Sequence, residues 1–241
     1  MDRRWKASIA AAALAAGCVA GLAGGSPAAA GSAAARAPAS FTTTIDNPYY
    51  PLPPGQLLVY HGVRDGEKQV DRVFVTDRTK VVNGVDTVVV RDIARNRSGA
   101  LIEKTFDWFA QDDLGNVWYF GEDTAEYGPH GHVISTEGSW TDGVDGATRG
   151  IIMEASPTVT DAYRQEYYAG QAEDQAWVIQ TGMHVDVPYG SLDSVLRTME
   201  WARIEPKVVD MKFYAPGIGI VLEKALAGGQ EVAELVKVSG P

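Results

Sequence analysis

Three carboxylates in the middle of the chain are spaced so that a folded sheet could bring them together. Turn residues at 112–115 and 128–131 separate apolar runs that are typical of neighbouring antiparallel strands. In the register that these turns predict, Glu122 lies directly opposite Glu137, with Asp107 near. Such a pair could act as general acid and base in glycoside cleavage, or bind a divalent cation through oxygen ligands. A wet outer sheet face with scattered acids is the alternative.

Aromatic residues surround these carboxylates in the sequence. The same register places Trp118 and Phe120 beside the acids, where flat rings would offer a platform for a sugar or an apolar ligand. It places Trp108, Tyr119 and Trp140 in one cross-strand row on the other face, which we expect to be core. A slip of one residue would exchange the two faces. The predicted ligand-binding residues are Trp118, Phe120, Trp140 and Asp107.

Other chemical motifs are weak. His130 and His132 flank a glycine, but Pro129 makes this segment a turn tip and no third ligand is indicated. The glycine-rich segment 141–147 lacks the full spacing of a calcium loop. The sequence contains no G-x-S-x-G elbow and no P-loop, and it has no dinucleotide fingerprint in a βαβ setting. We therefore predict no cofactor and no metal centre, and we favour binding over enzymatic activity.

Strand signals dominate the chain from Phe41 onward. β-rich runs alternate with Gly, Pro, Asn and Asp turns, and Asn83-Gly84 between valine-rich runs predicts a tight hairpin. One short helix is predicted at 172–179. The fold class is all-β: an antiparallel meander curled into a barrel, half-barrel or sandwich, forming a single domain over 41–241. Strands are predicted near 56–63, 69–79, 85–93, 100–110, 116–127, 132–140, 162–168, 183–188, 195–204, 208–214, 219–226 and 231–238.

The first 30 residues are typical of an export signal. Charged residues at positions 2–6 precede an alanine-rich apolar run. Signal peptidase could cleave after Ala30, which would give a secreted protein with a flexible lead-in over 31–40. Alternatively, Cys18 lies in a loose lipobox and could be lipidated, which would give a membrane-anchored lipoprotein. No later apolar stretch approaches the roughly 20 residues that span a bilayer.

Charge and cysteine content exclude several classes of function. The formal net charge is -10, and this acidity disfavours nucleic acid and anionic lipid as partners. The chain has one cysteine, which lies in the leader, so the domain has neither disulfides nor thiolate metal sites. Stability must come from burial and strand pairing.

The segment 213–221, Phe-Tyr-Ala-Pro-Gly-Ile-Gly-Ile-Val, is similar to a turn of exported bacterial β-meander proteins of unknown function that carry a YAPGxG motif. A second stretch, 113–122, resembles another segment common in that group. The resemblance implies a curved antiparallel sheet or incomplete barrel. It implies no catalytic residue, because no activity is established for the group.

These observations favour an exported β-sheet binding protein for a small apolar or carbohydrate ligand, or for an envelope partner. One alternative is an extracellular hydrolase that uses Glu122 and Glu137 as its carboxylate pair. Another is a structural or envelope-associated module with no small-molecule chemistry.

Overall fold

The computed structural model describes residues 38, 40–64 and 66–241. The predicted export signal, Cys18 and most of the lead-in lie outside this part of the chain. Every element of regular structure in the described residues is a strand, which confirms the all-β prediction. The helix predicted at 172–179 is wrong. This segment opens strand β12 (Asp174–Val187), because Asp174, Ala176 and Val178 alternate with less buried neighbours and pair with β13.

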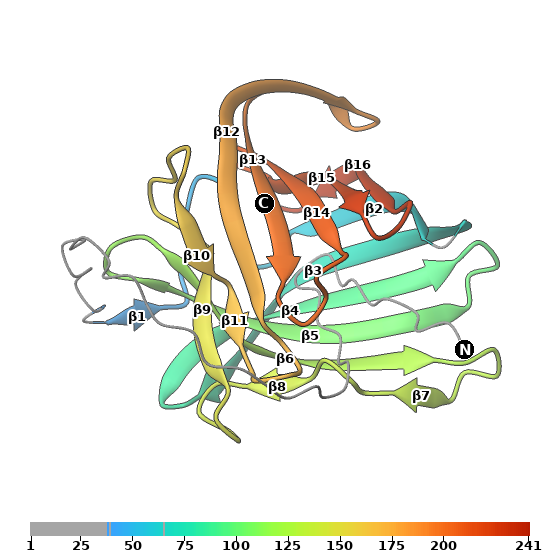
Figure 1. Ribbon diagram of the computed structural model, residues 1–241, viewed down its shortest axis with the longest axis horizontal. Coiled ribbons are helices and arrows are strands. Elements are labelled where there is room, and N and C mark those ends of the chain that lie inside the picture. The colour runs from blue at the N-terminus through green and yellow to red at the C-terminus, as the bar shows by residue number, and fades with distance from the viewer. Residues whose placement is uncertain (1–37, 39, 65) are drawn as a thin grey trace.

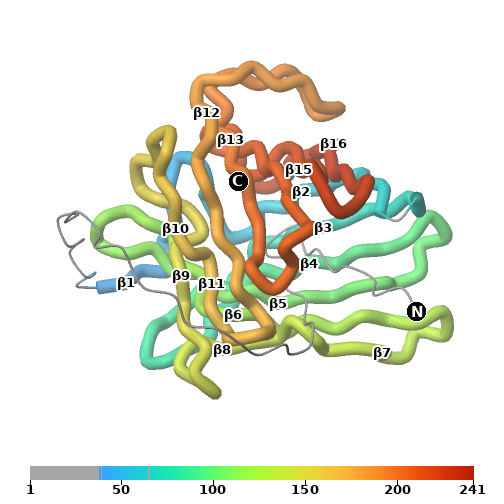
Figure 2. Tube along the Cα trace, in the orientation of Figure 1, coloured from blue at the N-terminus to red at the C-terminus, as the bar shows by residue number. Residues whose placement is uncertain are grey.

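Thirteen strands follow one another around a nearly closed antiparallel sheet, in the order β10-β12-β13-β14-β15-β16-β2-β3-β4-β5-β6-β9-β11, with β1, β7 and β8 attached to β5 and β6 (Figure 1). The remaining gap is narrow, since β10 lies against β9 and β11 against β12. Beyond the barrel, β12 and β13 continue as one long hairpin at the top of the view in Figure 2. The strands are β1 (Phe41–Thr42), β2 (Leu57–Arg64), β3 (Glu67–Val82), β4 (Val85–Asn96), β5 (Leu101–Asp112), β6 (Val117–Tyr127), β7 (Val133–Ser135), β8 (Trp140–Thr141), β9 (Thr148–Met153), β10 (Ala162–Arg164), β11 (Glu166–Tyr167), β12 (Asp174–Val187), β13 (Gly190–Ala202), β14 (Val209–Ala215), β15 (Gly219–Ala227) and β16 (Val232–Ser239).

The β3–β4 hairpin turns at Asn83-Gly84, as predicted. Both residues have positive φ, 47° and 79°, as a two-residue primed turn requires. The prediction of one continuous strand over 132–140 is wrong, because the middle of this segment is not a strand. β7 and β8 are separated by a turn that contains Glu137, so the chain does not run straight along β6.

A bulge at Gly121 shifts the register between β5 and β6 and changes which face some β6 residues take. Asp107 pairs with Glu122 and Phe109 with Tyr119, so β6 has one more residue than β5 between these pairs. Gly121 has φ +129°, and a Cβ there would lie 2.3 Å from the Trp140 carbonyl oxygen. The bulge places Tyr119 and Glu122 on the same, inward face.

The outer face of the sheet has its own small apolar cluster. Trp108 and Phe120 pack there with residues from β3, β4 and β5. The predicted core row is therefore wrong for Trp108, because Tyr119 pairs with Phe109 and packs with Trp140 in the main core. Phe41 of β1 covers Phe120 at a ring distance of 5.3 Å, and the Arg149 guanidinium lies 4.9 Å from the Phe120 ring. This cluster belongs to the fold, because it holds β1 through Phe41 and β9 through Arg149.

Candidate functional site

The barrel interior is apolar at one level and acidic at the next. On β4, inward Val90 is followed two residues later by Asp92, and on β5 Asp107 precedes inward Phe109 by two residues. The same change recurs on strand after strand. We call the acidic layer the carboxyl girdle. Its members, each at most 9% exposed, are Asp71, Asp92, Glu103, Asp107, Glu122, Glu166, Asp174, Glu200, Asp210 and Glu223.

The buried Lys212 and the half-buried Arg64 partly balance this layer. Lys212 Nζ lies 2.9 Å from Glu200 Oε2, and Arg64 Nη1 lies 3.1 Å from Glu103 Oε2. Burial by itself would lower the pKa of Lys212, but Glu200 and Glu223 outweigh it and raise that pKa. The girdle has ten carboxyls, so most of them must be neutralised by protons or by cations from outside.

Burial raises the pKa values of several girdle carboxyls, and neighbouring acids raise them further. The pKa of Asp210 is raised to about 9 and that of Glu223 to about 7, with desolvation as the main cause in both. Desolvation also holds the pKa values of Asp107 and Glu122 well above the ordinary range, and each is raised further by nearby carboxylates.

Tyrosines lie between the apolar and acidic layers. The Tyr119 hydroxyl donates to Asp107 Oδ1 at 2.8 Å, and the Tyr214 hydroxyl donates to Glu200 Oε1 at 2.9 Å. Several girdle oxygens nevertheless accept no hydrogen bond within the described residues. They are Asp71 Oδ1, Asp107 Oδ2, Asp210 Oδ1 and Glu223 Oε2.

The girdle meets a pocket of about 360 Å³ at Glu122. We call it the Glu122 pocket. Its volume falls within the range of about 300–1,000 Å³ that is usual for small-molecule sites. Glu122 is 3% exposed, so it is a nearly buried group that still lines the pocket. The lining residues are Lys80, Trp108, Glu122, Asp123, Ser139, Trp140, Thr141, Val144, Asp145 and Tyr168.

Aromatic rings form two of the pocket walls. Trp140 pairs with Glu122 across β8 and β6, and its ring meets Tyr119 edge-on at 5.3 Å. On the outer side, Lys80 Nζ lies 3.1 Å from the centre of the Trp108 ring. Rings and carboxylates in one pocket favour a cationic group, since both attract positive charge.

The loop between β8 and β9 is fastened by Asp142. Its Oδ1 accepts the Arg149 backbone N–H at 2.9 Å, and its Oδ2 accepts both Arg149 Nη1 at 2.9 Å and Asn83 Nδ2 at 3.1 Å. The last bond ties the β3–β4 hairpin to the loop. Lys80 and Asp145 are thereby positioned at the same pocket.

The predicted site residues are only partly brought together. Glu122 and Trp140 line the pocket, and Asp107 lies behind Glu122 as its strand partner. Glu137 is exposed in the β7–β8 turn and does not face Glu122, so the predicted Glu122–Glu137 pair is wrong. The reason is the break between β7 and β8, which puts Trp140 opposite Glu122.

The prediction that Trp118 and Phe120 form an aromatic platform beside the carboxylates is also wrong, because both rings lie on the opposite face of the sheet. The Gly121 bulge sends both rings to the outer cluster under Phe41, away from the carboxylates. Trp118 Nε1 donates to Asp112 Oδ2 at 2.8 Å, which holds the ring against the β5–β6 turn.

Lys80 was not predicted as a pocket residue. The girdle carboxyls other than Asp107 and Glu122 were also missed. One signal was available for the girdle, because inward acids fall at a spacing of two from inward apolar residues. Lys80 gave no signal, since it lies 28 positions before Trp108 in the sequence and meets that ring only through the curl of β3.

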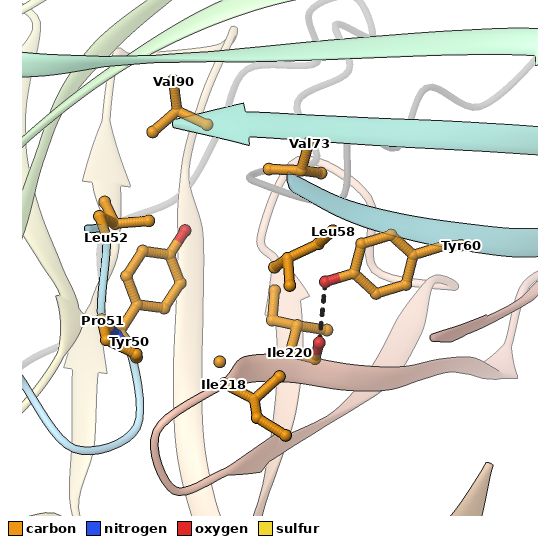
Figure 3. Close-up of a pocket in the computed structure, with 10 residues that line it drawn as sticks. Tyr50, Pro51, Leu52, Leu58, Tyr60, Val73, Val90, Ile218 and Ile220 are labelled. Carbon is orange, nitrogen blue, oxygen red and sulfur yellow. Dashed lines mark hydrogen bonds between the residues drawn. The ribbon is translucent and has the colours of Figure 1, made fainter. Parts of the chain in front are cut away.

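A second, apolar cavity lies at the other level of the interior (Figure 3). Leu58, Tyr60, Val73 and Val90 are among its lining residues, and the Tyr60 hydroxyl donates to the Ile220 carbonyl oxygen at 2.8 Å. Its volume is about 30 Å³. That volume admits about one water, so this level of the interior is a packed core.

Residues 38, 40–64 and 66–241 contain neither a metal-ligating cluster nor a membrane-spanning helix. No group of three or more His, Cys, Asp or Glu residues in that part of the chain is arranged to hold a metal ion. Within the same residues, no helix is long and apolar enough to cross a membrane.

No family model and no curated protein matches the chain. Two solved structures are similar to it. One is a Bacteroides fragilis protein provisionally described as exported, with a YmcC-like fold; the TM-score is 0.48 and the identity 15%, over 80% of this chain and 100% of that one. The other is a Parabacteroides distasonis protein provisionally described as a lipoprotein; the TM-score is 0.44 and the identity 13%, over 80% of this chain and 99% of that one.

Proposed function

We propose that this chain is an extracytoplasmic binding protein that holds a small organic cation in the Glu122 pocket. The observation that carries the proposal is the position of Glu122. It is nearly buried, it lies opposite Asp107, and it still lines a pocket large enough for a small molecule. An ammonium group placed there would stabilise the ionised carboxylate and relieve its repulsion from Asp107.

The charge of the pocket supports a cation over an anion. Its lining contains three carboxylates and one ammonium group. Behind Glu122 lie Asp107 and Glu166, which raise the pKa of Glu122, and Asp107 Oδ2 accepts no hydrogen bond within the described residues. An anionic ligand would face repulsion from the exposed carboxylates Asp123 and Asp145 and could not stabilise an ionised Glu122.

The ligand classes expected from the sequence receive less support. An apolar ligand would need an apolar cavity, but the apolar cavity of the interior is about 30 Å³. A carbohydrate remains compatible with the aromatic walls and hydroxyls, so it belongs in the test. The hydrolase alternative loses its carboxylate pair because Glu137 lies elsewhere. The leader sequence supports an extracytoplasmic location.

Isothermal titration calorimetry on the purified full chain tests the proposal with four probes: butylammonium, butanol, butyrate and glucose. The first three share size and differ in charge. We expect saturable binding of butylammonium alone. Glu122→Gln should weaken that binding by about tenfold or more, because it removes a charge-assisted contact while keeping the shape of the side chain.

Glu137→Gln is the matched control, since it removes one carboxylate that is exposed and outside the pocket. It should leave the affinity within about twofold of the original, as expected for a screened surface charge. Binding of glucose or butyrate in preference to butylammonium would overturn the proposal. So would equal losses in the two variants.

A further inference from the structure

The outer wall of the Glu122 pocket already contains a cation on an aromatic ring. Lys80 Nζ lies 3.1 Å from the centre of the Trp108 ring. Lys80 is an exposed residue near the end of β3, whereas Trp108 is 4% exposed and has its ring covered. The ammonium therefore occupies the face through which the ring could meet a pocket ligand.

A second lysine on the same face of the sheet provides a comparison. Lys104 Nζ lies 4.6 Å from the Phe106 ring centre, on the same strand as Trp108. Neither Lys104 nor Phe106 lines the Glu122 pocket. Lysine over an aromatic ring thus occurs twice on this face, but only at Lys80 does the lysine share a pocket with a nearly buried carboxylate.

We propose that Lys80 is a tethered competitor: its ammonium occupies the cation subsite on Trp108, and a ligand binds by displacing it. The inference rests on the proposed function, because it concerns regulation of the same pocket. The ligand is then an organic ammonium compound whose charged head lies between Glu122 and the Trp108 ring, which both line the pocket, once Lys80 Nζ has left the ring. Lys80 lowers the affinity, because its displacement must accompany binding.

Displacement is physically accessible. The side chain is long and flexible, and its holding contact is a ring face rather than a rigid ion pair. Partial burial lowers the pKa of Lys80, whereas Asp123 raises it, so Asp123 is an available partner for the displaced ammonium. The hairpin that holds Lys80 is joined to the facing loop through Asn83 and Asp142, which keeps the backbone in place while the side chain moves.

The test titrates tetramethylammonium into the full chain and its Lys80→Met variant. This probe has no N–H group, so it reports the aromatic face rather than hydrogen bonding to carboxylates. Lys80→Met should bind it about two- to fivefold more tightly, the change expected from removing one exposed cation–π competitor. Lys104→Met removes a comparable lysine outside the pocket and should change nothing.

Two further variants separate this effect from a general change of charge. Lys80→Arg keeps a cation over the ring and should not gain affinity. Adding Trp108→Leu to Lys80→Met should abolish the gain, because the subsite itself is then lost. Equal or weaker binding by Lys80→Met, with the original chain still binding butylammonium, would overturn this inference alone. If the original chain binds no cation, the proposed function fails as well.

Discussion

Asp107 and Glu122 face each other across β5 and β6, and the Tyr119 hydroxyl donates to Asp107 Oδ1 at 2.8 Å. Two carboxyls so close in a nearly dry interior cannot both be ionised without a compensating charge. This relationship joins the acidic layer of the barrel to the Glu122 pocket.

Removing the tyrosine hydroxyl should destabilise the barrel. Tyr119→Phe leaves the ring in place but removes a buried hydrogen bond to Asp107. We expect a loss of about 1–3 kcal/mol in the free energy of unfolding, because Asp107 then has one more unsatisfied oxygen. Urea denaturation followed by fluorescence measures it. Tyr189→Phe, on an exposed ring, serves as control, and equal effects would contradict the assignment.

Stability should fall as the pH rises. The folded pKa of Asp210 is raised to about 9 and that of Glu223 to about 7, so the folded chain retains protons that the unfolded chain has released. This contribution is complete below about pH 4 and is lost progressively up to the folded pKa values. Calorimetric unfolding should therefore show a lower Tm at pH 8 than at pH 5.

A single substitution tests the origin of that slope. Asp210→Asn should flatten the dependence of the unfolding free energy on pH by up to about 1.4 kcal/mol per pH unit between about pH 4 and 9. Asp86→Asn, at an exposed position of β4, should leave the slope unchanged. If the unfolding free energy of the original chain rises over this pH range, the girdle carboxyls are not held in their protonated form.

Cation binding should release protons. Burial, Asp107 and Glu166 raise the pKa of Glu122, and a bound ammonium favours its ionised form. Affinity for butylammonium should therefore increase with pH until Glu122 is already ionised in the ligand-free protein. Titrations in two buffers of different ionisation enthalpy count the released protons. A binding enthalpy that is independent of the buffer would argue against Glu122 as the ligand's partner.

The β6 bulge should tolerate only glycine. Gly121→Ala combines a positive φ with a Cβ placed 2.3 Å from the Trp140 carbonyl oxygen, so β8 would have to move. We expect a loss of about 2–4 kcal/mol. Gly84→Ala has a positive φ and nothing within 4 Å of the added Cβ, so it isolates the conformational cost, about 1 kcal/mol. Equal losses would show that the close approach is unimportant.

The buried Lys212–Glu200 ion pair should contribute more to the free energy of unfolding than a surface ion pair does. Lys212→Met leaves Glu200 without its 2.9 Å partner in the interior, and we expect a loss of about 3–5 kcal/mol near neutral pH. Lys212→Met combined with Glu200→Gln should recover much of it, because no charge is then stranded. A double variant no more stable than the single one would contradict this account.

Much of the architecture follows from local patterns in the sequence. Alternation of apolar and polar residues predicted the antiparallel strands, and Asn83-Gly84 predicted the hairpin that brings Lys80 to the pocket, because these signals depend on neighbours a few residues away. The same alternation drew attention to Glu122, Asp107 and Trp140.

Tertiary structure decided which face each residue takes and what it meets. The bulge at Gly121 depends on the close approach of Trp140, and the break between β7 and β8 moves Glu137 out of reach. Neither leaves a periodic signal, and one extra residue in a strand is enough to exchange its faces. The layer of buried carboxyls exists only because ten positions far apart in the sequence converge when the sheet curls. The sequence by itself determined an acidic all-β chain; curvature and register, set by long-range packing, decided that its acids lie inside.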